Sequence, residues 1–256
     1  MAAKNIRFEN AAGQRLSASI DLPDDRPPVA YTLFAHCFTC SKNLKPVRHI
    51  SRALNRSGIG VLRFDFTGLG ESEGRFPDTN FTSNVADLLS AAAFLEAQYA
   101  SPAMLIGHSL GGAAALQAAA ALPACRAVVT IAAPADPTHV RHLLKDHQDV
   151  IAAKGEAAVV LAGRTFHIKK QFLDDLEATR MGDVIRDLNR ALLILHSPVD
   201  DIVEIENAAR IFKLARHPKS FISLDRADHL LLAPADAAYV GRVIAAWAGR
   251  YLEPQR

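Results

Sequence analysis

Short β-rich runs alternate with longer stretches rich in alanine and leucine along this 256-residue chain, and that alternation constrains the fold more than any other feature. It predicts an α/β fold, in which mostly parallel strands are joined by helical crossovers that cover both faces of the sheet. Strands are expected at residues 5–9, 15–21, 29–35, 58–66, 103–107, 127–132, 191–195 and 220–224. Helices are expected at residues 47–57, 80–99, 110–121, 204–215 and 235–251. The first two strands are expected to pair as an antiparallel hairpin.

One segment interrupts the alternation. After the sixth strand, a charged stretch of roughly residues 134–190 precedes the next core strand. We therefore predict a core formed by residues 1–133 and 191–256, with residues 134–190, here called the cap segment, inserted between the sixth and seventh strands of the fold. Within the cap segment a hairpin is expected around residues 157–168, turning at Gly163.

The charge balance excludes several classes of partner. The chain has 29 Lys and Arg against 27 Asp and Glu, whereas nucleic-acid binding by counterion release needs many clustered cations. No apolar stretch approaches the length of a bilayer span. The amino terminus includes Lys4, Arg7 and Glu9 and lacks the continuous apolar run of a secretory signal. We expect a cytoplasmic protein without a nucleic-acid or membrane partner; the oligomeric state is not readable.

Residues 107–111 form the motif Gly-x-Ser-x-Gly at a predicted junction between a strand and a helix. This context is typical of a nucleophile elbow, a tight turn that exposes a nucleophilic serine, here Ser109. Gly107 and Gly111 would be required because side chains two positions before and after the serine would collide in such a turn. The start of the helix directs N–H groups toward an anion formed near the hydroxyl, and the first is that of Leu110.

A serine hydroxyl needs a base, and the base needs a group that orients it. On this kind of sheet the partners follow the serine in the order acid, then histidine. Asp200 and Asp201 lie in the loop after the strand at 191–195. Asp200 is favoured by its position relative to that strand, while Asp201 is expected to face solvent or to help start the next helix. His229 follows the last strand and is the predicted base.

Three other histidines lie at strand ends or loops of the predicted sheet. His36 follows the third strand, His108 lies within the elbow and His196 ends the strand before Asp200. His108 is expected to point away from the serine. His229 alone combines the required order along the chain with a position in the required loop.

The loop after the third strand contains Cys37-x-x-Cys40, preceded by His36. The spacing matches thioredoxin-type redox motifs, and the three residues could also contribute to a zinc site. A thioredoxin motif starts a helix in a smaller βαβ unit, however, and zinc needs a fourth ligand that no nearby pair provides. Three cysteines, Cys125 included, cannot all pair, and a core of this size needs no disulfide. Unpaired, buried cysteines are therefore expected, with redox modulation by Cys37 and Cys40 as an alternative hypothesis.

With these residues in place, the chain resembles an α/β-hydrolase from end to end. The sequences at residues 34–42, 63–70, 106–112 and 217–220 resemble the hydrolase half of bacterial α/β-hydrolase/OsmC fusion proteins. The resemblance implies an α/β-hydrolase fold and a serine esterase, whose fused partner is similar to thiol-dependent peroxide reductases. The chain ends at Arg256 without such a partner, so a stand-alone enzyme and part of a longer protein are both compatible with it.

The resemblance also points to a second oxyanion donor. Related enzymes usually carry His-Gly-x in the loop after the third strand, and this chain has His36, Cys37 and Phe38 there. Phe38 would supply the N–H group, while Cys37 occupies the glycine position. This departure raises the question of whether the local backbone tolerates a side chain.

The sequence therefore predicts a serine hydrolase that cleaves small carboxylic esters, with Ser109 as nucleophile, His229 as base and then acid, and Asp200 orienting His229. The cycle needs no metal or organic cofactor. Hydrolysis of amides, peptides or thioesters and acyl transfer stay open on the same residues. A non-catalytic binding module on the same fold is the alternative from another class.

The cap segment is expected to cover the site and to set the size and polarity of the substrate. Its cations Arg164, Lys169 and Lys170 could bind an acidic substrate group, although solvated surface charges are the simpler interpretation. Its apolar residues at positions 166, 172 and 173 are expected to pack the cap segment onto the core.

Overall fold

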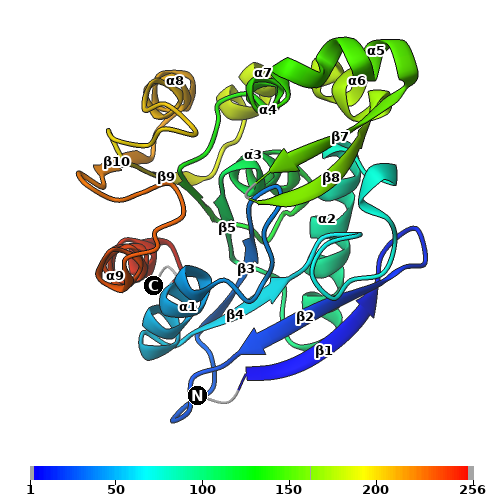
Figure 1. Ribbon diagram of the computed structural model, residues 1–256. Helices are drawn as coiled ribbons and strands as arrows, with labels where there is room; N and C mark the ends of the chain where they lie inside the picture. The colour runs from blue at the N-terminus through cyan, green and yellow to red at the C-terminus, as the bar shows by residue number, and fades with distance from the viewer. Residues whose placement is uncertain (1–2, 162, 253–256) are drawn as a thin grey trace.

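A computed structural model of the chain describes residues 3–161 and 163–252, and its main feature is an eight-stranded sheet (Figure 1). The strand order is β1-β2-β4-β3-β5-β6-β9-β10, with antiparallel pairing of β1 with β2 and of β2 with β4 and parallel pairing elsewhere. The strands are β1 (Ala3–Glu9), β2 (Arg15–Asp21), β3 (Ala30–Ala35), β4 (Ile59–Phe64), β5 (Met104–His108), β6 (Ala127–Ile131), β9 (Ala191–His196) and β10 (Lys219–Ser223). The predicted α/β fold and its amino-terminal hairpin are confirmed.

Helices cover both faces of this sheet. Helices α1 (Lys45–Arg56) and α9 (Pro234–Leu252) pack together on one face, and α2 (Phe81–Gln98), α3 (Leu110–Ala118) and α8 (Glu206–Leu214) lie on the other (Figure 1). The predicted helix at 110–121 thus ends three residues early, in a 3-10 turn at Ala119–Ala121.

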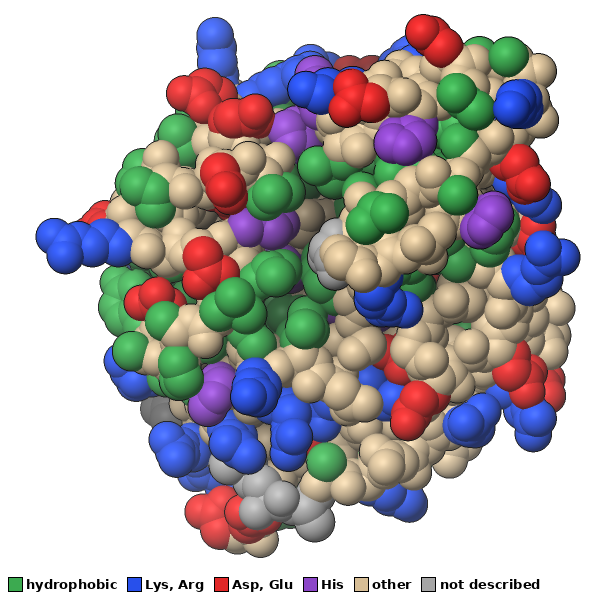
Figure 2. Space-filling model, in the orientation of Figure 1, with side chains coloured by type: hydrophobic (Ala, Val, Ile, Leu, Met, Phe, Trp, Pro, Cys, Tyr) green, Lys and Arg blue, Asp and Glu red, His purple; other side chains and the backbone are tan. Residues whose placement is uncertain are grey.

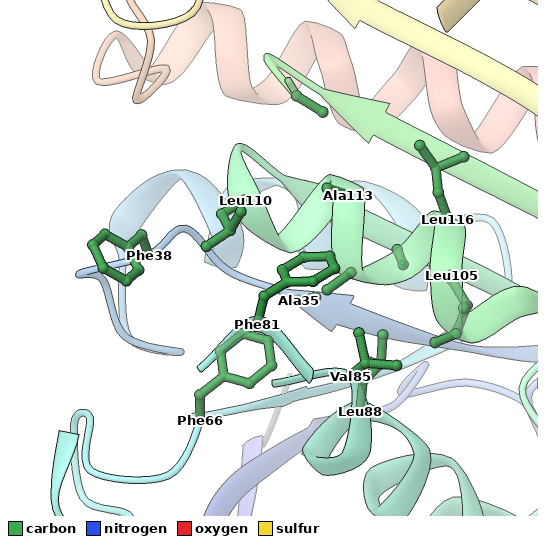
Figure 3. Close-up of a cluster of buried hydrophobic side chains, with 14 of the residues drawn as sticks. Ala35, Phe38, Phe66, Phe81, Val85, Leu88, Leu105, Leu110, Ala113 and Leu116 are labelled. Atoms are coloured by element: carbon green, nitrogen blue, oxygen red, sulfur yellow. The ribbon is translucent and has the colours of Figure 1, made fainter. Parts of the chain in front are cut away.

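Successive side chains along each central strand point to opposite faces of the sheet, so the core consists of two clusters, one on each face. On β5, Leu105 packs into the cluster that contains α2 and α3, whereas Met104 and Ile106 pack into the cluster beneath α1 and α9. Figure 3 shows part of the first cluster, to which β5 contributes Leu105 and α3 contributes Leu110 and Leu116. A parallel strand covered on both faces must be apolar on both, which is why its sequence is a near-continuous apolar run. The rigid sheet fixes the loops at its carboxyl edge.

The cap segment lies between β6 and β9 along the chain and forms the upper part of the molecule in Figure 1. Its regular elements are helices α4 (Val140–Leu143), α5 (Gln148–Lys154), α6 (Lys170–Ala178) and α7 (Met181–Arg186) and an antiparallel hairpin of β7 (Glu156–Leu161) and β8 (Arg164–Lys169). The hairpin matches the prediction, and Gly163 at its turn has a φ of 73°, in the left-handed region that favours glycine.

Contacts of two kinds join the cap segment to the core. The Asp175 carboxylate on α6 accepts hydrogen bonds from the backbone N–H (2.9 Å) and hydroxyl (2.6 Å) of Thr82 at the start of α2. The rings of Phe166 and Phe172 pack on Phe76 and Phe38 with centroids 4.9 and 5.0 Å apart. Phe166, Phe172 and Leu173 are all buried, as the sequence predicts for residues that pack the cap segment onto the core.

Candidate active site

The turn from β5 into α3 holds Ser109 in a conformation that L-residues rarely adopt. Its φ is 54° and its ψ is −128°. The turn is held by the Ser109 N–H, which donates to the Ile131 carbonyl on β6 (2.9 Å), and by the Ser109 carbonyl, which accepts from the Gly112 N–H (2.8 Å). Strain of this kind persists only where the surroundings impose it, and it commonly occurs at active sites.

The glycines around Ser109 are required by close backbone contacts. A Cβ atom on Gly107 would lie 2.5 Å from the carbonyl carbon of Gly111, and one on Gly111 would lie 2.5 Å from the carbonyl oxygen of Ala35. Gly112, to which the sequence analysis assigned no role, is equally constrained, since its Cβ would lie 2.5 Å from that of Ala133. The Gly111 contact brings the elbow against the end of β3 and the loop that follows it, since the same Cβ would also collide with the His36 carbonyl oxygen.

His229 and Asp200 form a hydrogen-bonded pair, although 29 positions separate them in the chain. The Nδ1–H of His229 donates to the carboxylate of Asp200 at 2.8 Å from Oδ2 and 3.0 Å from Oδ1. Oδ1 also accepts from the backbone N–H groups of Ile202 and Val203, each at 3.0 Å. Asp201 is exposed instead. Of the two neighbouring carboxylates, the structure therefore pairs Asp200 with the histidine.

The surroundings of Asp200 keep its carboxylate ionised. Burial alone would raise its pKa, but the hydrogen bond and charge of His229, with the two backbone donors, outweigh burial and lower the pKa below its ordinary value. An ionised carboxylate accepts the Nδ1 proton of His229 and leaves Nε2 as the nitrogen that can act as a base.

Two histidines not assigned to the site by sequence support the loops that carry it. His108 Nε2–H donates to the His229 carbonyl (2.7 Å), and His196 Nε2–H donates to the Val203 carbonyl (2.7 Å). Burial, together with the neighbouring His229, lowers the pKa of His108 to about 3. His108 is thus a neutral donor at the end of β5 that ties the loop holding His229 to the elbow.

This buried histidine should make the protein sensitive to acid. The unfolded chain binds a proton at His108 below its ordinary pKa of 6.5, but the folded protein does so only near 3, so the free energy of unfolding falls as the pH drops through that window. Between about pH 7 and about pH 5, H108Q, whose amide can still donate, should lose about 2 kcal/mol less stability than the wild type. Urea unfolding at both pH values measures the difference, and equal losses would contradict it.

The two predicted oxyanion donors come from two neighbouring segments, the start of α3 and the loop after β3. Leu110 is the first residue of α3, where an N–H has no partner within the helix, and Phe38 lies in the loop after β3. Among the residues that the structure describes, none accepts a hydrogen bond from either N–H. Within residues 3–161 and 163–252, Cys37 is not one of the non-glycine residues with a positive φ. The backbone at this position therefore accommodates a side chain in place of the usual glycine.

Ser109 and His229 both line one cavity of about 390 Å³. Most of its other side chains are apolar: Phe38, Leu44, Leu143, Leu161, Ile202 and Leu230. Arg164 of the cap segment also lines it and donates a hydrogen bond to the Thr39 carbonyl (3.4 Å). Figure 2 shows hydrophobic side chains gathered around a hollow near the middle of this face. Lys169 and Lys170, the other two cap cations considered in the sequence analysis, make ion pairs with Asp78 and Asp174, respectively.

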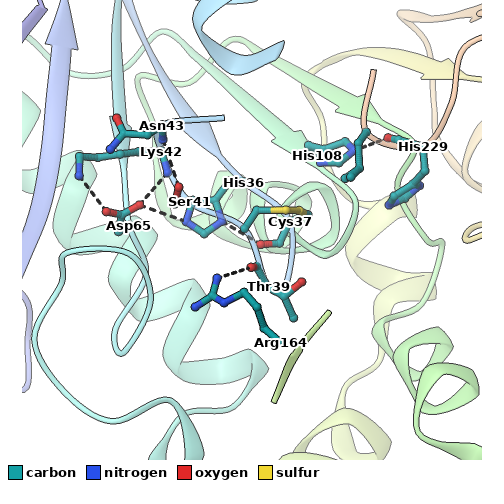
Figure 4. Close-up of a disulfide and its surroundings, with 12 residues drawn as sticks. His36, Cys37, Thr39, Ser41, Lys42, Asn43, Asp65, His108, Arg164 and His229 are labelled. Carbon is teal, nitrogen blue, oxygen red and sulfur yellow. Dashed lines mark hydrogen bonds and ion pairs between the residues drawn. A yellow bond between two sulfur atoms is a disulfide. The ribbon is translucent and has the colours of Figure 1, made fainter. Parts of the chain in front are cut away.

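Cys37 and Cys40 are joined by a disulfide in the cavity wall (Figure 4). The expectation of unpaired cysteines was wrong for these two residues, because a turn of the loop brings their Cα atoms to 5.3 Å, within the range that a disulfide spans. Cys125 is free and buried. The zinc alternative loses its ligands, since both sulfurs are bonded to each other, and the described residues contain no group of three or more side chains arranged to hold a metal ion.

A buried ionic network behind this loop was missed at the sequence level. Lys42 is 1% exposed, and its ammonium lies 2.8 Å from Oδ2 of the fully buried Asp65 (Figure 4). The Lys42 N–H also donates to Oδ1 of Asp65 (2.6 Å), and the Lys42 carbonyl accepts from Arg63 (2.7 Å). Charged residues at positions 63 and 65, near the end of the otherwise apolar strand predicted at residues 58–66, were the available signal. The network holds the end of the loop to β4.

Removal of the Lys42 ammonium should destabilise the fold, because the Asp65 carboxylate would stay buried without the cation that it pairs with. We expect K42M to lower the free energy of unfolding by about 3–5 kcal/mol. K170M is the matched control, since the exposed Lys170–Asp174 pair should contribute at most about 1 kcal/mol. Urea unfolding of the two variants measures both effects; similar losses would show that the buried pair has no special role.

Comparisons with known proteins bear on the whole chain. A family model described as "Alpha/beta hydrolase family" matches residues 32–255. The crystal structure of an esterase domain from Rhodothermus marinus is similar with 58% identity and a TM-score of 0.83, covering 99% of this chain and 100% of that one. Est1E from Butyrivibrio proteoclasticus, solved with ferulic acid, shares the fold with 18% identity and a TM-score of 0.79, over 96% and 99% of the two chains. The uncharacterised protein YfhR of Salmonella typhimurium is 21% identical over 229 residues, 89% of this chain and 75% of YfhR.

Proposed function

Because the chain belongs to the alpha/beta hydrolase family, we propose that it is a serine esterase that cleaves small carboxylic esters through an acyl-enzyme. One observation carries the proposal: Ser109, strained in the elbow, and His229, paired with Asp200, line the same cavity. The 58% identity to the Rhodothermus marinus esterase domain supports ester chemistry. The narrower resemblance to the hydrolase half of OsmC fusion proteins stays a prediction.

In the proposed mechanism the oxygen of Ser109 attacks the ester carbonyl while Nε2 of His229 takes the hydroxyl proton. The buried Asp200 carboxylate orients the ring and stabilises its charged form. The N–H groups of Leu110 and Phe38 hold the oxyanion of the tetrahedral intermediate. His229 then protonates the departing alcohol, and a water molecule activated by the same nitrogen hydrolyses the acyl-enzyme.

The lining of the cavity favours an ester with an apolar acyl or alcohol group. Its side chains are mostly apolar, and a cavity of about 390 Å³ suits a small ligand. Leu143, Leu161 and Arg164 bring the cap segment into the wall, so we assign residues 134–190 the role of a cap that limits substrate size. Arg164 is the cap cation placed to meet an acidic group on a substrate.

A fluorophosphonate probe tests the serine, and an ester series tests the substrate class. The probe should label Ser109 stoichiometrically, and the labelled peptide is identified by mass spectrometry. Esters of increasing acyl length, with a matched amide and thioester, then establish the preferred bond. A protein that neither reacts with the probe nor hydrolyses any substrate would instead be a binding module, whereas faster turnover of the amide or thioester would replace the ester assignment.

A further inference from the structure

The disulfide closes a four-residue turn, residues 37–40, that carries one of the proposed oxyanion donors. Cys37 and Cys40 are its ends, Phe38 lies between them, and the Cys40 N–H donates to the Cys37 carbonyl at 3.1 Å. Figure 4 shows the disulfide in this loop, beside His36. The cross-link therefore constrains the short turn from which the Phe38 N–H is donated.

The chain on either side of the turn is already anchored. On one side, His36 directly after β3 is buried, and its ring packs on Phe66 with centroids 5.0 Å apart. On the other, Lys42 is held to Asp65 through both its backbone and its ammonium. The Phe38 ring is fixed by Phe172 of the cap segment, 5.0 Å away. If the disulfide is broken, the resulting change in conformation must therefore occur within residues 37–40.

Breaking the bond changes the space that the sulfurs occupy. Bonded sulfurs lie about 2.05 Å apart, whereas two thiols separate to van der Waals contact, more than about 3.5 Å. Cys37 is buried, and its outward movement is restricted by the packed core. The backbone of the turn must shift instead, and an oxyanion donor is effective only within about 2.7–3.1 Å of the developing charge.

The sulfurs are also within reach of small reagents. Both cysteines line the cavity that contains Ser109 and His229, so a molecule that enters the site meets the disulfide. Cys125, by contrast, is buried outside that cavity, and its Sγ–H donates to the Ala127 carbonyl (3.3 Å). Within proteins of reducing compartments, the disulfides that do occur are usually transient and redox-sensing or catalytic.

We propose that the Cys37–Cys40 pair is a redox switch of ester hydrolysis, with the disulfide form active and the dithiol form slower. The inference rests on the proposed function, because it acts through the Phe38 N–H. In the switching step two low-molecular-weight thiols each supply one electron and one proton: the protein S–S bond breaks, two cysteine thiols form and the reagent leaves as its disulfide. Exchange with an oxidised thiol reagent such as glutathione disulfide reverses the step.

Reduction displaces one donor and leaves Ser109, His229, Asp200 and the Leu110 N–H in place. Complete loss of an oxyanion donor costs about 10²–10³-fold in kcat, so a displaced donor should cost about tenfold. KM should change less than kcat, because the donor acts on charge that develops in the transition state.

The test compares the wild type, oxidised with glutathione disulfide or reduced with dithiothreitol. The reagent is removed before assay, because thiols themselves cleave activated esters. Thiols titrated in denaturant should rise from one to three per chain, which verifies each state. We expect kcat for a p-nitrophenyl ester to fall about tenfold on reduction and to recover on reoxidation. Circular dichroism at the assay temperature checks that the reduced protein stays folded.

Two variants locate the effect. C40S should show the low kcat of the reduced wild type under both conditions, whereas C125S should respond to reduction as the wild type does. An unchanged kcat in a protein whose thiol count has risen to three would overturn the switch, and so would a response that persists in C40S. Fluorophosphonate labelling separates the two proposals: if Ser109 reacts while kcat ignores the redox state, the esterase assignment stands and the switch fails.

Discussion

Replacement of Ser109 by alanine is expected to lower kcat for a small p-nitrophenyl ester by about 10⁵–10⁶-fold. The reason is that the variant has no nucleophile at the elbow, so the acyl-enzyme cannot form and His229 has no hydroxyl to activate. The fold should survive, because alanine adds no atom to a position that already holds a Cβ at a φ of 54°. Steady-state hydrolysis, corrected for the uncatalysed reaction, measures the loss.

The control for this variant is another serine-to-alanine change outside the cavity. Ser90 lies on α2, where its hydroxyl donates to the Ala86 carbonyl, and S90A should keep wild-type activity. Circular dichroism and thermal unfolding establish that both variants are folded. Activity of S109A within about tenfold of the wild type would exclude an acyl-enzyme at Ser109 and with it the proposed mechanism.

Asp200→Asn is expected to reduce kcat by about 10⁴-fold. A neutral amide no longer stabilises the charged His229 ring, and its N–H₂ group can force the imidazole into the tautomer whose Nε2 carries the proton. The amide oxygen can still accept from the Ile202 and Val203 N–H groups, so the loop should keep its conformation. The measurement is kcat across a pH series, with unfolding midpoints as the check on the fold.

D201N is the matched control, because it makes the same chemical change at the adjacent, exposed carboxylate. We expect its kcat to stay within about twofold of the wild type, as is usual for a surface change away from the site. The opposite pattern, with a large loss in D201N and a small one in D200N, would transfer the acid's role to Asp201 and contradict the pairing with His229.

The parts of the candidate site that could be predicted are those that depend on short stretches of sequence. The Gly-x-Ser-x-Gly motif identifies the elbow because the steric conflict between Gly107 and Gly111 is decided within five residues. The loops that hold Asp200 and His229 follow predictable strands, and parallel strands present their carboxyl ends at one edge of the sheet. Chain order and strand position were therefore enough to select His229 and to favour Asp200 over Asp201, while the catalytic roles of these residues await the experiments above.

Other features depend on pairs of residues that no local pattern relates. Lys42 and Asp65 meet only because the loop after β3 passes the end of β4, and His108 reaches the carbonyl of a residue 121 positions away. The spacing of Cys37 and Cys40 permits a disulfide, a metal site or simple packing, and the backbone turn decides among them.

By itself the sequence determined the α/β fold and predicted the insertion and the elbow, because hydrophobic periodicity and glycine sterics act over short stretches of chain. Only the tertiary structure decided which carboxylate faces His229, that Cys37 and Cys40 are bonded, and that the cap segment contributes Arg164 to the cavity wall. These outcomes depend on the relative placement of distant loops, which is set by the packing of the whole core, and periodicity carries no information about that placement.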